Sequence, residues 1–216
     1  AQVEGIFISH EHSDHIAGLQ QLLKRFDIPV YTKQGTWREI QDKLVVPKNQ
    51  LIELTKGSLT LGNLIVEPFA VSHDAADPIG INVFSGKDKA TVVTDTGIIS
   101  DDILHRIDDS TLLVLEANYD PHMLRFGPYQ PFLKQRVASD EGHLSNEMAA
   151  QALLMMKRPD FMQVILAHRS ENNNNAVLVT QTIGKMLVDG GVRIGSEMKL
   201  QHGQPNEIVS MQSIKR

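Results

Sequence analysis

The chain has 216 residues, 41% of them hydrophobic and 5% aromatic, and a formal net charge of −5 at pH 7. That length suits one large α/β domain, and no stretch approaches the ~18 to 20 apolar residues that a membrane span requires. The absence of cysteine excludes disulfides, thiolate metal sites and cysteine nucleophiles, and it fits a reducing cytoplasm. The negative charge argues against a basic nucleic-acid coat over the whole surface. We therefore expect one cytoplasmic domain spanning residues 1–216, with no membrane partner.

The first half of the chain alternates segments typical of strands and helices. The expected elements are a strand at 6–9, a helix at 16–26, a strand at 29–32, a helix at 36–44 and a strand-rich stretch at 51–94. Glycine-containing turns are expected within this stretch at 56–58, 61–63 and 86–88. This alternation indicates an α/β fold.

The second half continues with longer helices. The expected elements are a helix at 100–107, a strand at 112–116, a helix opened by Ser145, a strand at 163–167 and a helix at 177–188 ended by Gly190-Gly191. Ser145 stands three residues before Met148, as an N-cap hydroxyl does. Between them, prolines and Gly127 keep the run 118–131 from forming one regular helix.

The most informative segment is His10-Glu11-His12-Ser13-Asp14-His15, which follows an apolar run. In an extended chain residues i, i+2 and i+4 share a face, so His10, His12 and Asp14 can point the same way. His15 follows where the chain turns into the next helix. Neutral imidazole and carboxylate are ligands that zinc, manganese and iron accept. The segment therefore predicts a metallohydrolase rather than a polar loop with surface histidines.

Three further polar residues, His73, Asp95 and His168, come directly after apolar runs. Each alone would more often be a structural polar group, but together they complete the ligands of the first cluster. The expected ligand sets are His10, His12 and His73 for one ion, Asp14, His15 and His168 for the other, and Asp95 as the bridge. Two divalent ions, zinc or manganese, would ionise a shared water near neutral pH and so make a hydrolytic nucleophile.

His143 precedes the helix opened by Ser145 and is the expected general acid or phosphate binder, with a helix-capping histidine as the alternative. We expect Asp14 to act with it in catalysis. Four cationic side chains that follow in the sequence predict a local basic rim: Arg125, Lys134, Arg136 and Arg169. Scattered solvated surface charges would explain them equally well. Five other polar side chains are expected to play no part at the ions: Glu11, Ser13, His105, His122 and His202. Ser13 is expected to cap the next helix instead.

The ligand order resembles that of the metallo-β-lactamase superfamily, and four further stretches resemble its YycJ/WalJ-type branch. These stretches are Glu116-Ala117-Asn118-Tyr119-Asp120, Gly127-Pro128-Tyr129-Gln130-Pro131, Gly142-His143-Leu144-Ser145-Asn146 and His168-Arg169-Ser170-Glu171-Asn172-Asn173. The resemblance covers essentially the whole chain. It implies an αββα sandwich and a cytoplasmic bacterial 5′-to-3′ exonuclease on double-stranded DNA, with Arg136, Arg169 and Asn173 binding substrate. The chain is also similar to ribonuclease Z, where a histidine placed like His143 assists phosphodiester cleavage.

The family has a longer segment before its first motif, so we expect the first N-terminal strands of the sandwich to be missing from this chain. The strand at 6–9 would then keep an unpaired edge. Two alternative functions stay open. The same metals could hydrolyse small esters, thioesters, lactones or β-lactams, which the overall negative charge favours slightly. The second alternative is a non-catalytic regulatory module that uses the metal only structurally. Against it, structural metal sites are usually closed around one ion.

Overall fold

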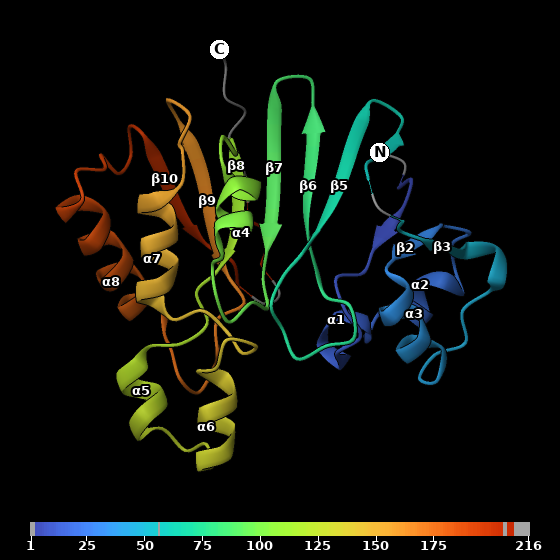
Figure 1. Cartoon of the computed structure of the whole chain (residues 1–216), viewed down its shortest axis with the longest axis horizontal. Helices are drawn as coiled ribbons and strands as arrows, with labels where there is room; N and C mark the ends of the chain where they lie inside the picture. Colours follow the sequence, from blue (N-terminus) through green and yellow to red (C-terminus); the bar gives the residue numbers. More distant parts are fainter. Residues whose placement is uncertain (1–2, 56, 205–206, 210–216) are drawn as a thin grey trace.

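The computed structural model describes residues 3–55, 57–204 and 207–209, and it consists of two β-sheets with helices on their outer sides (Figure 1). The smaller sheet is parallel, in the order β1-β2-β3, with β1 (Ile6–Phe7), β2 (Val30–Thr32) and β3 (Leu51–Glu53). The larger sheet has the order β10-β9-β8-β7-β6-β5-β4. Its strands are β4 (Leu59–Leu61), β5 (Leu64–Ala70), β6 (Ile79–Ser85), β7 (Asp88–Val93), β8 (Leu112–Glu116), β9 (Met162–Ala167) and β10 (Met198–His202).

Eight α-helices and one 3₁₀ turn connect these strands within the described residues. They are α1 (Ser13–Ile16), α2 (Leu19–Leu23), α3 (Gln34–Gln41), η1 (Lys48–Gln50), α4 (Asp101–Ile107), α5 (Pro121–Phe126), α6 (Pro131–Val137), α7 (Asn146–Met155) and α8 (Ala176–Asp189). Within the same ranges, no helix has the length and apolar character needed to cross a membrane.

Three cores hold the layers together. Helices α4, α7 and α8 bury apolar side chains against the central strands of the larger sheet, with Ile103, Leu153, Ile183, Leu113 and Val164 all at most 2% exposed. Helices α2 and α3 pack on the smaller sheet through a second core: Leu19, Leu23, Trp37, Ile40 and Val30. Tyr31, Leu54 and Ile79 form a third core where the two sheets face each other. This helix–sheet–sheet–helix order confirms the expected αββα sandwich.

Several local expectations are confirmed. Strand β8 has the expected bounds, and the Ser145 hydroxyl accepts a hydrogen bond from the Met148 N–H at 3.2 Å, as an N-cap does. The turns at 61–63 and 86–88 join β4 to β5 and β6 to β7, with Gly62 and Gly86 in the left-handed region. The turn expected at 56–58 includes residue 56, which lies outside the described residues. The single domain over 1–216 stays a prediction.

Other local expectations are wrong. The helix at 16–26 is broken around Gly18 into α1 and α2, and Ser13 does not cap it, because His12 occupies the N-cap position without a side-chain bond. The run 118–131 is not one regular helix, as expected, but it is not wholly irregular either, because it contains the short helix α5 and leads into α6. Both helices begin with a proline, at a position where a missing N–H costs nothing. Strand β10, after Gly190-Gly191, was not foreseen.

Strand direction decides where the functional residues meet. Strands β7, β8, β9 and β10 are mutually parallel, and β5 runs in the same direction as β7 because both are antiparallel to β6. Their carboxyl ends therefore share one edge of the larger sheet. In Figure 1 this is the lower edge, where the loops end between α1 on one side and α5 and α6 on the other.

Candidate metal centre

The eight side chains predicted from the sequence to act at the centre converge at this edge from separate segments of the chain. The first segment follows β1, and the others follow β5, β7 and β9 or precede α7. The side chains are His10, His12, Asp14, His15, His73, Asp95, His143 and His168. The backbone thus brings together residues up to 158 positions apart in the sequence (10 to 168).

Asp95 lies at the middle of the cluster. Its Oδ1 is 3.3 Å from His168 Nε2 and 3.7 Å from His73 Nε2, and its Oδ2 is 3.4 Å from His15 Nε2. One carboxylate therefore faces histidines from both expected ligand sets, which is the geometry that a bridging ligand requires.

The two expected ligand sets each come together. His10, His12 and His73 offer donor atoms that lie within 4.8 Å of one another, and so do Asp14, His15 and His168. Two overlapping groups meet the same criterion: His10, His15 and Asp95, and Asp95, Glu116, His143 and His168. The donor atoms are all imidazole nitrogen and carboxylate oxygen, which suits zinc or manganese.

In each of the buried histidines His10 and His73, Nδ1 makes a hydrogen bond and Nε2 makes none. His73 Nδ1 donates to the Gly142 carbonyl at 3.1 Å, which leaves the lone pair on Nε2. Among the described residues, His10 Nε2, His73 Nε2 and Asp95 Oδ2 are buried without a hydrogen-bond partner. Leaving buried polar atoms unpaired is costly unless something coordinates them. These residues therefore fit a bound cation.

The electrostatics of the cluster agree with that fit. Burial, helped by the neighbouring His15, lowers the pKa of His10 to about 3, so this ring is neutral, as a ligand must be. Burial also acts against the charged form of His168, but hydrogen bonds to Asp14 and Glu116 outweigh it and raise its pKa to about 10. The ring of His168 thus sits in a surplus of carboxylate charge. A divalent cation would neutralise that charge and displace the proton.

Two of the cluster residues have strained backbones. Asp95 and His168 have φ values of 57° and 50°, in the left-handed region that residues other than glycine seldom adopt. Such a conformation costs about 1–3 kcal/mol per residue, and it persists where the surrounding structure holds a functional side chain in place.

Glu116 is a central residue that the sequence interpretation left without a role. It is fully buried, and its Oε1 accepts from His168 Nδ1 at 2.7 Å and His143 Nδ1 at 2.9 Å. Its Oε2 accepts from the N–H groups of Leu144 at 3.0 Å and Thr96 at 3.3 Å. A glutamate that ends a buried apolar strand was the available signal, because a charge there needs partners.

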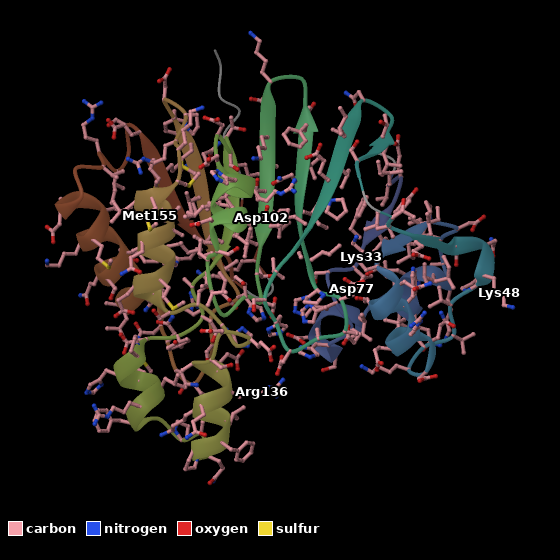
Figure 2. The ribbon with its side chains drawn as sticks, viewed as in Figure 1. Lys33, Lys48, Asp77, Asp102, Arg136 and Met155 are labelled. Carbon is pink, nitrogen blue, oxygen red and sulfur yellow. The ribbon has the colours of Figure 1, made fainter. Side chains whose placement is uncertain are left out.

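Asp74 was also missed, although it follows His73 directly. Its Oδ1 is 3.4 Å from His73 Nε2 and its Oδ2 pairs with the guanidinium of Arg136. Arg136 reaches it from the side of α6 that faces the sheet edge (Figure 2). The ion pair therefore ties α6 to the centre and compensates part of the charge that Arg136 was expected to offer to substrate.

A pocket of about 840 Å³ opens beside the cluster and is lined by His143, His168, Arg169 and Ser170, among others. One guanidinium nitrogen of Arg169 is buried there without a hydrogen-bond partner among the described residues. Asn173, by contrast, is fully buried and does not line this pocket. Its backbone N–H and its Nδ2 both donate to the Ser170 hydroxyl, at 3.2 and 3.4 Å.

The side chains expected to play no part at the ions lie outside the four donor groups among the described residues. Glu11 turns toward the loop after β5, where its carboxylate accepts from the Ala76 N–H at 2.8 Å. His105 and His122 are exposed, whereas His202 is half-buried in β10 and contacts the Thr180 hydroxyl at 2.9 Å.

Comparison with known proteins gives consistent relatives. The chain matches the family model described as "Beta-lactamase superfamily domain" over residues 1–168. It is 35% identical over 214 residues to exodeoxyribonuclease YycJ of Bacillus anthracis, covering 98% of this chain and 81% of that protein. It is 31% identical to exodeoxyribonuclease WalJ of Streptococcus pneumoniae serotype 2, covering 98% and 80%.

Solved structures share the fold. The metallo-β-lactamase fold protein YhfI of Bacillus subtilis has a TM-score of 0.66 at 15% identity, covering 93% of this chain and 75% of that one. The short form of human tRNase Z has a TM-score of 0.54 at 21% identity, covering 77% and 73%.

Proposed function

Since this chain belongs to the metallo-β-lactamase superfamily and is a metal-dependent hydrolase, we propose that it is a 5′-to-3′ exonuclease acting on double-stranded DNA with two divalent ions. The observation that carries the proposal is the hydrogen bond between His143 and Glu116. It fixes the His143 ring, the proposed proton donor, beside the ligand cluster and the 840 Å³ pocket. The names of the two exodeoxyribonuclease relatives support the choice of DNA, and a DNA substrate implies work in the cytoplasm.

Under this proposal His10, His12 and His73 would hold one zinc or manganese ion, Asp14, His15 and His168 would hold the other, and Asp95 would be the ligand that both ions share. When bound, such ions lower the pKa of a coordinated water and polarise a phosphoryl oxygen. Support comes from the bare Nε2 atoms of His10 and His73 and from the carboxylate surplus around His168.

The other groups of the chain act around that centre. Glu116 holds Nδ1 of His143, which fixes the ring and leaves Nε2 to deliver a proton to the departing sugar oxygen. Asp14, the most exposed carboxylate of the ligand sets, orients the attacking water. Arg169 binds phosphate in the 840 Å³ pocket, and Asn173 supports Ser170 in the wall of that pocket. Arg136 adds a second cation in a smaller pocket of about 190 Å³ that His143 also lines.

A second candidate function is hydrolysis of small esters, thioesters, lactones or β-lactams at the same centre. The net charge of −5 favours it, because a phosphate polymer meets long-range repulsion. A purely structural role for the metals fits less well, because the donor sets extend over a cluster open to a large pocket rather than closing around one ion.

The test compares leaving groups in the His143→Ala variant. A sugar oxygen leaves poorly without a proton, so turnover of end-labelled duplex DNA should fall ~10²–10⁴-fold. An activated aryl phosphodiester needs little protonation and should be much less affected, with metal content unchanged. His105→Ala, at an exposed histidine of α4, is the matched control.

Three results would contradict the proposal. Loss of a metal ion from His143→Ala would make His143 a ligand. Equal slowing of both substrates would remove the general-acid role. Wild-type protein that opens lactones or thioesters but leaves DNA intact with manganese or zinc would favour the second candidate function.

A further inference from the structure

Helices α5 and α6 and their connection, here called the helical pair (residues 121–137), project beyond the sheet edge next to the metal centre (Figure 1). Each helix is too short to be stable alone in water. The pair is held by its own small core, in which Leu124 and Val137 pack with Tyr119, Tyr129 and Leu133. A separate core for so short a segment indicates that its outer surface is displayed in a defined shape.

That outer surface carries two large aromatic rings. The Phe126 and Phe132 side chains are 66% and 71% exposed. The guanidinium carbon of Arg125 lies 5.3 Å from the centroid of the Phe126 ring, and the His122 ring lies 4.6 Å from it. The surface therefore combines exposed π faces with a cation beside one of them.

This segment carries a net positive charge, whereas the chain as a whole is negatively charged. Residues 121–139 contain Arg125, Lys134 and Arg136 but no aspartate or glutamate, whereas the whole chain has a net charge of −5. The Lys134 ammonium donates to the backbone carbonyl of Arg125 at 2.8 Å, which fixes this cation of α6 at the end of α5. A protein partner would favour a surface whose centre is depleted of charge, whereas phosphates favour clustered cations.

The helical pair also borders the centre directly. A second pocket, of about 190 Å³, is lined by Tyr129 and Arg136 of the pair together with Asp74 and His143. Tyr129 also lines the 840 Å³ pocket, so the pair separates the two openings beside His143. A strand whose phosphate reaches the centre therefore has its neighbouring nucleotides beside the pair.

We propose that the helical pair binds unpaired nucleotides of the substrate strand, with Phe126 and Phe132 stacking on bases and Arg125 contacting the backbone. This inference rests on the proposed nuclease function. Aromatic rings stack on any base and cations follow the phosphates, which is the chemistry of binding to single strands without sequence preference. Bases within an intact duplex are already stacked on each other, so the surface selects strands that have been separated.

The test uses the metal-loaded enzyme and two DNA substrates, a blunt duplex and one with a short unpaired extension. The Phe126→Ala/Phe132→Ala double variant should raise KM for the extended substrate about tenfold or more and change its kcat little. Arg125→Ala should raise KM and flatten its salt dependence. Phe126→Trp keeps a stacking face and should retain the wild-type KM.

Matched controls come from the opposite side of the molecule, where Arg25 and Phe26 after α2 repeat the same exposed residue pair, with Phe26 52% exposed. Arg25→Ala and Phe26→Ala should leave KM for both DNA substrates unchanged. Hydrolysis of a small aryl phosphodiester reports the metal centre itself, and circular dichroism confirms that each variant is folded.

Separate outcomes distinguish this inference from the proposed function. If the wild type cleaves DNA and the double variant keeps the wild-type KM on both substrates, the helical pair is not a nucleotide-binding surface and the nuclease function stands. If the variants alter sedimentation but not KM, the face belongs to a second copy of this chain, and the inference is overturned. If the wild type hydrolyses the aryl diester but no DNA, the proposed function fails first and the inference fails with it.

Discussion

Glu116→Gln is the most informative single substitution, because it keeps the size of a fully buried side chain and changes its charge and its hydrogen bonding. The carboxylate accepts four hydrogen bonds, two from histidine rings on Oε1 and two from backbone N–H groups on Oε2. Glutamine offers one acceptor oxygen. In either orientation of the amide, two buried donors face an NH₂ group and lose their acceptor.

The magnitude follows from that count. A buried donor left unsatisfied costs about 1–3 kcal/mol, so two of them should lower the free energy of unfolding by about 2–6 kcal/mol. Loss of a hydrogen bond to a ligand histidine such as His168 should also reduce metal affinity or activity ~10–100-fold. Urea unfolding followed by circular dichroism measures the first effect, and metal titration measures the second.

The control is Glu53→Gln, at an exposed glutamate of β3, where the change should stay within about 0.5 kcal/mol. The reasoning would be refuted by a Glu116→Gln protein with the urea midpoint and metal affinity of the wild type. That result would mean that the two rings find other acceptors and that Glu116 does not organise the centre.

Three further predictions follow from single sites. If the centre holds the two ions proposed above, Asp95→Ala should weaken the binding of both together because Asp95 faces both ligand sets, and elemental analysis that finds only one ion lost would place the bridge elsewhere. Gly142→Ala should destabilise the protein and impair activity, since an added Cβ would lie 2.3 Å from the carbonyl oxygens of Arg136 and Val137. Gly18→Ala, with open space around it, is the control, and equal thermal unfolding temperatures of the two variants would contradict this packing. Leu187→Ala, fully buried in α8, should lower the free energy of unfolding by about 2–5 kcal/mol without changing metal content, and a loss below 1 kcal/mol would show that the core closes over the gap.

The sequence by itself was enough to predict the ligand clusters and the type of fold. His10, His12, Asp14 and His15 are neighbours in the chain, so their proximity needs no tertiary information. His73 and His168 follow apolar strands, and the carboxyl ends of parallel strands meet at one edge of a sheet. Local patterns such as the Ser145 cap are likewise governed by neighbouring residues, which is why the structure confirms them.

Only the tertiary structure decided which polar residues organise that centre. Glu116 meets His168 across 52 residues, because the register of β8 beside β9 pairs Glu116 with Ala167. It meets His143 across 27 residues, where the Leu144 N–H also donates to its carboxylate. Neither separation is visible in the local sequence. The same holds for the Asp74–Arg136 pair, across 62 residues, which fastens α6 to the sheet edge. Hydrophobic periodicity reports which side of an element is buried, whereas these contacts depend on how distant elements are placed against one another.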